Sequence, residues 1–166
     1  MTNLHSQPDR LRRRLGRRQK GFSLIELLIV IAIILVIAAI AVPNYNKYQM
    51  AGRETAVITE LGVLYGAQTL YYSNFGKYAA NLTELGPPTG GADGPQGANL
   101  IPKTLAEGMH NGYRYTMVGN GGGFSVTAIP EVFNSSGRRT FFMDQTKTIH
   151  QNWSAEPANA NSPELK

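Results

Sequence analysis

The chain has 166 residues, enough for one compact domain and one membrane segment. It contains no cysteine, which excludes disulfides and thiolate metal sites, and its three histidines show none of the spacings typical of metal sites. The net charge of +5 lies in residues 1–21, since the remainder has nine bases and ten acids, so charge does not support nucleic-acid binding by the main body.

Residues 1–21 form a basic leader, with seven arginines and lysines against one acid. Arg17, Arg18 and Lys20 lie directly before a long apolar segment. A basic cluster in this place keeps its end of a membrane segment in the cytoplasm and sends the other end outward. A disordered basic arm is the alternative interpretation, and we favour the topogenic role.

Residues 22–42 form an apolar segment in which only Ser23 and Glu26 are polar. As a helix its 21 residues would span roughly 30 Å, about the thickness of the bilayer hydrocarbon. An ordinary secretory signal has a shorter apolar core that ends at a cleavage site of small residues. Here the segment continues through Pro43 into further helical sequence. We therefore predict a retained transmembrane helix.

Glu26 is the anomaly of this segment, because a charged residue in mid-membrane costs about 2.5–3.5 kcal/mol and usually has a partner. No lysine or arginine lies nearby on the apolar side. Glu26 can be an interfacial residue. Alternatively, a cut after Gly21 would create an amine at Phe22 about one helical turn away. We predict that this amine, supplied by a neighbouring subunit, pairs with Glu26 only after cleavage and only in an assembly.

The sequence KGFSLIELL at residues 20–28 resembles the prepilin cleavage and methylation motif of type IV pilins and pseudopilins. The resemblance is strong over residues 17–48. It implies that a prepilin peptidase and N-methyltransferase cuts after Gly21 and methylates Phe22. It also implies that Glu26 acts in filament assembly. The 21-residue leader is longer than the shortest ones in the family.

The resemblance further implies the partners and the location of the chain. A pilin starts in the inner membrane and assembles with copies of itself and with minor pilins. It passes through an inner-membrane assembly platform onto a pilus at the cell surface, or into a periplasmic pseudopilus. It contacts inner-membrane lipid and requires no nucleic acid, metal or cofactor.

Beyond the membrane segment, Pro43 is predicted to kink the helix, although it could instead end it. Helical spacing continues to about Tyr72, which predicts a single helix roughly 77 Å long. One face of its second half is apolar and carries Val57, Leu61, Leu64 and Tyr71. Other faces are expected to carry Arg53, Glu54 and Glu60.

Glycines and aromatic residues are frequent along this second half. Gly62 and Gly66 predict either close packing, against the head or a neighbouring subunit, or a chance spacing. The aromatic residues are expected to pack in a core or to anchor the interface, rather than to form a conductive track. They are Tyr45, Tyr48, Tyr65, Tyr71, Tyr72, Phe75 and Tyr78.

The rest of the chain reads as a loop followed by a small antiparallel sheet. Gly76 should end the helix, and the loop that follows is rich in glycine and proline. Its predicted helical turns are 82–85 and 104–107. The predicted strands are 113–118, 124–129, 140–143 and 147–150. The polar tail is expected to be disordered.

We therefore predict an α+β fold in which a long, kinked N-terminal helix packs on a small antiparallel sheet, as in pilins. The predicted parts are a cleaved leader (1–21), a transmembrane and filament-core helix (22–42), a head (43–151) and a disordered tail (152–166).

No catalytic constellation emerges, because the acids Asp93, Glu107, Glu131 and Asp144 are scattered. We predict a structural subunit of a type IV pilus. The main alternative is a pseudopilin of a type II secretion system, and a membrane-anchored enzyme is a remote third. Many pilins carry a cysteine pair, and major secretion pseudopilins tend to carry clustered carboxylates for calcium. The chain has neither feature.

Overall fold

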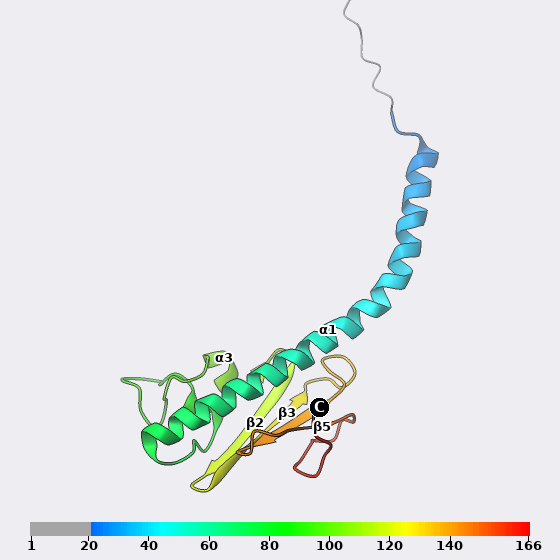
Figure 1. Ribbon diagram of the computed structural model, residues 1–166. Coiled ribbons are helices and arrows are strands. Elements are labelled where there is room, and N and C mark those ends of the chain that lie inside the picture. The colour runs from blue at the N-terminus through cyan, green and yellow to red at the C-terminus, as the bar shows by residue number, and fades with distance from the viewer. Residues whose placement is uncertain (1–20) are drawn as a thin grey trace, which may run out of the picture. The chain divides into compact units, whose positions relative to one another are not determined.

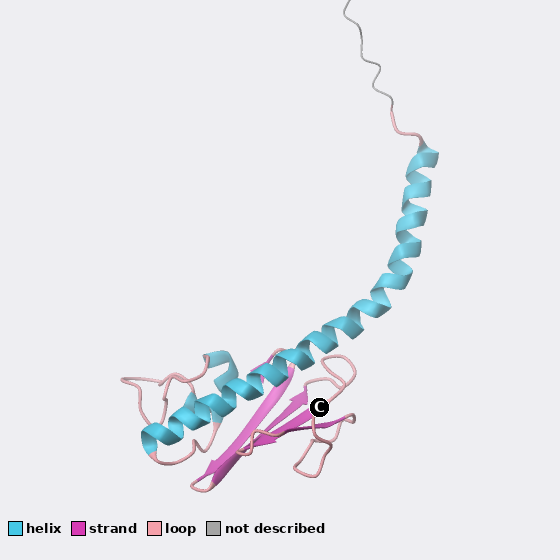
Figure 2. Ribbon diagram, viewed as in Figure 1, coloured by secondary structure: helices cyan, strands magenta, loops and turns pink. Residues whose placement is uncertain are grey.

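The computed structural model describes residues 21–166 of the chain (Figures 1 and 2). The basic leader, including Arg17, Arg18 and Lys20, lies outside the described residues. The described chain divides into two units, one ending at Ile40 and the other running from Ala41 to Lys166. The second unit holds the folded head.

The helix α1 runs from Leu24 to Phe75 and contains 52 residues. It continues through Pro43 without a break, so the interpretation in which this proline ends the helix is wrong. The kink at Pro43 stays a prediction. The helix stops where the sequence places its end: Gly76 has a φ of +70° and donates its N–H to the Tyr72 carbonyl at 2.8 Å. Glycine is favoured there because a left-handed residue closes many helices.

Five antiparallel strands form one sheet in the order β1-β2-β3-β4-β5. The strands are β1 (Met109–His110), β2 (Tyr113–Asn120), β3 (Gly123–Pro130), β4 (Thr140–Asp144) and β5 (Ile149–Asn152). The short helices α2 (Leu82–Leu85) and α3 (Lys103–Ala106) lie in the preceding loop. The predicted α+β fold is confirmed. β5 begins two residues later than predicted, and the two-residue β1 was not predicted.

The head core lies between one face of the sheet and the second half of α1. Alternate residues of β2 and β3 point inward, as the period of two requires. The predicted apolar face of α1 is confirmed, since Val57, Leu61, Leu64 and Tyr71 are all fully buried. The predicted core packing of aromatic residues is also confirmed for Tyr71 and for Tyr65, Phe75 and Tyr78, which pack against the core.

Glu54 does not lie on another face of α1, contrary to expectation. It is 1% exposed and belongs to the side that faces the sheet. Its carboxylate accepts from the Arg138 backbone N–H at 2.7 Å and from Arg139 Nε at 2.8 Å. Arg139 Nη2 lies 2.8 Å from the same carboxylate, and Arg139 Nη1 donates to Gln151 Oε1 at 2.8 Å. This ion pair joins α1 to the segment before β4.

Glu60, also expected on another face, makes a second polar junction with the sheet. Its carboxylate lies 2.5 Å from His110 Nδ1 and accepts from Asn111 Nδ2 at 2.6 Å. The Tyr115 hydroxyl donates to the other carboxylate oxygen. Burial, followed by this bond to Glu60, raises the pKa of Tyr115 above its usual range. Together, Glu54 and Glu60 fix the position of α1 along the sheet.

The tail is not disordered, contrary to expectation, because it forms a strap along β5. Ala158 is 3% exposed, and its N–H donates to Thr140 Oγ1 at 3.0 Å. Gln151 N–H donates to the Pro163 carbonyl at 2.9 Å, and Leu165 N–H donates to the Ile149 carbonyl at 2.8 Å. The strap uses backbone groups that an edge strand otherwise leaves unpaired.

Gly62 and Gly66 do not pack closely against the head. Both are exposed, and a Cβ added at either position would meet nothing within 4 Å. The part of the prediction that placed them against their own head is therefore wrong. Packing against a neighbouring subunit is untested.

Candidate processing and assembly segment

The predicted cleavage junction lies immediately before α1. Gly21 and Phe22 precede the first helical residue, Leu24, and are outside regular secondary structure. Phe22 is 87% exposed, and the space around the Gly21 Cα is open. A peptidase needs access to both sides of the scissile bond, and this junction offers it without unwinding the helix.

Ser23 and Glu26 form a reciprocal cap at the start of α1. Glu26 Oε2 accepts from the Ser23 backbone N–H at 3.0 Å, and Ser23 Oγ accepts from the Ile25 N–H at 3.3 Å. The first helical backbone bond follows, from Leu27 N–H to the Ser23 carbonyl at 3.2 Å. This is a capping box, which satisfies N–H groups that the first turn of a helix leaves free.

The cap changes the interpretation of Glu26. Within its own chain Glu26 already has a backbone partner, and its pairing with a neighbour's Phe22 amine after cleavage stays a prediction. A carboxylate in the first turn of a helix also interacts favourably with the helix dipole, by about 0.3–1 kcal/mol. The signal was present in the sequence as S-x-x-E before an apolar run, and it was missed because Glu26 was examined only for a cationic partner.

The N-terminal half of α1, up to Val42, presents an apolar surface in which Glu26 is the one polar side chain. From Leu24 to Val42 its large apolar side chains are 47–79% exposed. By length and composition this part of α1 is able to cross a membrane. A surface helix of a soluble protein instead shows charged residues on its outer side. The segment therefore requires a partner, either lipid or protein.

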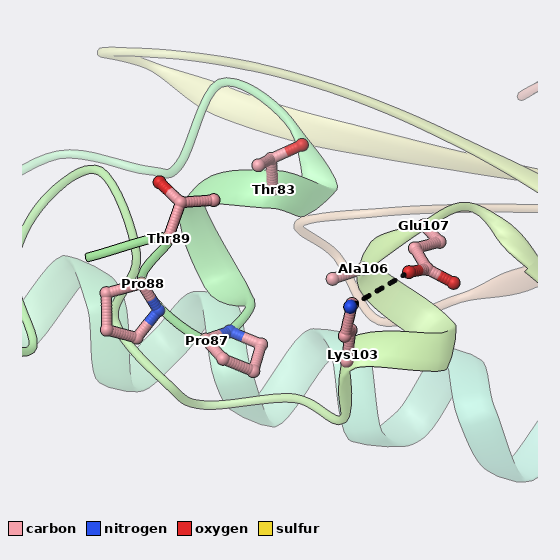
Figure 3. A pocket seen from close by; sticks show the side chains of 7 residues that line it. All are labelled: Thr83, Pro87, Pro88, Thr89, Lys103, Ala106 and Glu107. Carbon is pink, nitrogen blue, oxygen red and sulfur yellow. Dashed lines mark ion pairs between the residues drawn. The ribbon is translucent and has the colours of Figure 1, made fainter.

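No alternative site with catalytic chemistry emerges among the described residues. A surface hollow of about 510 Å³ lies between α2, α3 and the Pro87-Pro88 loop (Figure 3). Its two charged groups, Lys103 Nζ and Glu107 Oε1, lie 3.8 Å apart as an exposed ion pair. The remaining lining residues are prolines, threonines and an alanine. Residues 21–166 also contain no group of three or more histidine or carboxylate side chains placed to hold a metal ion.

A family model and several known proteins match the N-terminal part of the chain. Residues 16–42 match the family model described as the prokaryotic N-terminal methylation motif. The chain is 42% identical over 73 residues to the type IV major pilin protein PilA of Myxococcus xanthus. It is 43% identical over 74 residues to the type IV major pilin protein PilE1 of Neisseria gonorrhoeae. The N-terminal part of the chain is therefore similar to type IV pilins.

These matches cover part of each protein. The alignment with the Myxococcus pilin covers 44% of this chain and 33% of that pilin, and the alignment with the Neisseria pilin covers 43% and 45%. The fimbrial protein EcpC of Eikenella corrodens is 44% identical over 41% of this chain and 44% of its own length. The chain thus matches between a third and a half of the length of these relatives. They are structural pilins and fimbrial proteins, so the secretion pseudopilin is not favoured.

Proposed function

We propose that this pilin is cut between Gly21 and Phe22, methylated at Phe22 and polymerised into a type IV pilus through the N-terminal half of α1. Its role is structural rather than catalytic. The observation that carries this proposal is the combination at the start of α1: an open junction, a capped helix end and an entirely exposed apolar surface. A filament of packed helices covers that surface.

The cap suggests how Glu26 acts during assembly. Cleavage at Gly21 places a positive amine on Phe22, one residue before the cap and beside the positive end of the helix dipole. In an apolar filament core this amine needs a negative partner. Glu26 is the only carboxylate of the apolar segment. We infer that it serves its own helix end in the monomer and also a neighbour's Phe22 amine in the filament, which selects one axial register.

The proposed route starts in the inner membrane. The basic leader holds the N-terminus in the cytoplasm, the segment 22–42 spans the bilayer and the head lies outside. Prepilin peptidase and N-methyltransferase processes the chain, and an inner-membrane platform adds it to copies of itself and to minor pilins. Pro43 is proposed to give the helix a kink at the end of the apolar segment.

Two substitutions at Glu26 separate the charge from the cap. Glu26→Gln keeps an acceptor for the Ser23 N–H but removes the charge, whereas Glu26→Ala removes both. Neither should impair membrane insertion, since insertion depends on the apolar segment. We expect both variants to be cleaved and to lose surface filaments counted by electron microscopy, with membrane levels unchanged by immunoblot.

The matched control is Ser23→Ala, which weakens the cap and leaves the charge. It should cost about 0.5–2 kcal/mol of helix-end stability and retain filaments. Abundant filaments in Glu26→Gln would show that the charge has no role in assembly. Loss of filaments in Ser23→Ala alone would assign the motif to helix capping instead.

A further inference from the structure

The chain contains two asparagines that are followed directly by glycine, Asn111 and Asn120. In such a pair the next backbone nitrogen can reach the side-chain amide carbon, because glycine has no side chain to obstruct a close approach. Asn111 and Gly112 form the turn between β1 and β2, and Asn120 ends β2 at the turn that leads into β3. The two asparagine side chains are held in opposite ways.

Asn111 is held by its amide nitrogen. Its Nδ2 donates to Glu60 Oε1 at 2.6 Å, and the Glu60 side chain is only 13% exposed. The following glycine is fixed as well, since Gly112 has a φ of +76° and its carbonyl accepts from the Glu131 N–H at 2.9 Å. A carboxylate at position 111 would lie beside that of Glu60, where like charges repel. Loss of the Asn111 amide is therefore disfavoured in the folded head.

Asn120 is held by its amide oxygen instead. Oδ1 accepts from the backbone N–H groups of Gly122 and Gly123, at 2.8 and 3.0 Å. Within residues 21–166 neither Asn120 Nδ2 nor the Gly121 N–H donates a hydrogen bond. Both residues are exposed, and a Cβ added at Gly121 would meet nothing within 4 Å. The attacking nitrogen and the amide nitrogen are thus both free, and two donors polarise the side-chain carbonyl.

We propose that Asn120 is a site of spontaneous deamidation, with the Gly121 backbone nitrogen as the attacking group. That nitrogen bonds to the Asn120 side-chain carbon and loses its proton. The bond from this carbon to Nδ2 breaks, and Nδ2 leaves as ammonia with that proton. Water then opens the resulting succinimide at one of its two carbonyls, which leaves aspartate or isoaspartate. The reaction needs no enzyme, because the reacting groups are neighbours in one chain.

The same two N–H groups favour both the reaction and its aspartate product. Negative charge develops on Oδ1 during the attack, and preorganised N–H donors stabilise such an oxyanion. An aspartate at position 120 would accept the same two hydrogen bonds, which are stronger with a charged acceptor. The reaction adds a negative charge to the tip of the β2–β3 hairpin. It does not depend on filament assembly, so it goes beyond the proposed function.

The test compares the two asparagines within one sample of the detergent-solubilised full chain. The chain is kept in mildly alkaline buffer, either folded or unfolded in urea, and is then digested with trypsin. Cleavage after Lys103, Arg114 and Arg138 places the two asparagines on separate peptides, 104–114 and 115–138. Fragmentation mass spectrometry locates the mass gain of deamidation and gives the rate at each position.

In the folded chain we expect Asn120 to convert about tenfold or more faster than Asn111. In urea both should convert at similar rates, because the bonds to Glu60, Gly122 and Gly123 are lost. Equal rates in the folded chain, or a folded chain in which Asn120 is stable, would overturn the inference. A preference for Asn120 that persists in urea would also overturn it, since local sequence alone would then be the cause.

Two variants separate the chemistry from the fold. Gly121→Ala should lower the Asn120 rate about tenfold or more, because a methyl group obstructs the attacking nitrogen. The open space at Gly121 predicts an unchanged melting temperature of the head. Asn120→Asp should also leave the melting temperature unchanged, since its carboxylate keeps both N–H donors. An unchanged rate in Gly121→Ala would show that the Gly121 nitrogen is not the attacking group.

Discussion

Glu54 provides the sharpest test of how the head is held on α1. The substitution Glu54→Gln keeps an oxygen for the Arg138 N–H but leaves the Arg139 guanidinium without its charged partner. That guanidinium is largely buried, with 17% of the side chain exposed, and Glu54 itself is 1% exposed. Removing one member of a buried ion pair typically costs 3–5 kcal/mol, because the other charge stays buried and uncompensated.

The effect should be large on the scale of the whole head. Domains of this size have stabilities of about 5–15 kcal/mol, and each kcal/mol shifts the melting temperature by about 2–8 °C. We therefore expect Glu54→Gln to lower the melting temperature by roughly 6–40 °C. Trp153 reports the transition, because it is the single tryptophan and its ring lies 4.9 Å from the Arg139 guanidinium carbon.

Two controls define what would refute this reasoning. Glu107→Gln removes an exposed ion pair with Lys103, and such pairs contribute about 0–1 kcal/mol, so its melting temperature should hardly change. The double variant Glu54→Gln with Arg139→Gln should recover part of the loss, because the largely buried Arg139 charge is no longer left unpaired, while the more exposed Arg138 still loses its ion pair with Glu54. Equal effects at positions 54 and 107, or a double variant that only adds the two losses, would show that the buried charge is not the cause.

Three further predictions concern the stability of the head. Burial raises the pKa of Tyr71 to about 12 and also raises the pKa values of Tyr113 and Tyr115, so between about pH 10 and 12 these phenols ionise more readily in the unfolded chain than in the folded head. Below pH 10 the free energy of unfolding should not depend on these tyrosines. Above pH 10 it should fall by up to about 1.4 kcal/mol per tyrosine per pH unit, measured by urea denaturation. A free energy of unfolding that stays constant from pH 10 to 11 would contradict this. Millimolar calcium should leave the melting temperature unchanged, whereas a rise abolished by Asp144→Ala would favour the secretion pseudopilin. Deleting the strap (residues 153–166) should lower the free energy of unfolding by about 1–3 kcal/mol, because Thr140 and the β5 edge lose their hydrogen-bond partners. An unchanged urea midpoint would mean that the contacts of the strap do not stabilise the head.

The regular elements could be predicted because their residues repeat with the period of the structure. The spacing of Val57, Leu61 and Leu64 gives one helical face, and alternation gives β2 and β3. Gly76 marks the end of α1 since its left-handed conformation suits glycine. In each case the signal lies within a few neighbouring residues, so no knowledge of the tertiary structure is needed.

The features that were missed depend on distant partners. Glu54 and Glu60 look like solvent-facing residues until Arg139 and His110, which lie 85 and 50 residues away, are placed opposite them. The two-residue β1 is too short to show any period. The tail has the composition of a disordered segment, but the edge of β5 supplies backbone partners that composition does not reveal.

In the candidate site, too, the features with a local sequence signal were predicted and the others were missed. The junction at Gly21, the apolar segment and the carboxylate of Glu26 were all evident from local sequence. The hydrogen bond that Glu26 accepts at the helix start was missed, and its pairing with a Phe22 amine stays a prediction.

The central claim is that this chain enters a filament as a subunit that begins at Phe22, and intact mass spectrometry of subunits from purified surface filaments tests it most directly. The account predicts a single species whose mass corresponds to residues 22–166 plus one methyl group, with fragmentation placing that group on the Phe22 amine. Gly21→Ala should block the cut and leave the uncut chain in the membrane. A filament subunit that retains Met1, or one cut within residues 38–41 as by signal peptidase, would contradict the account.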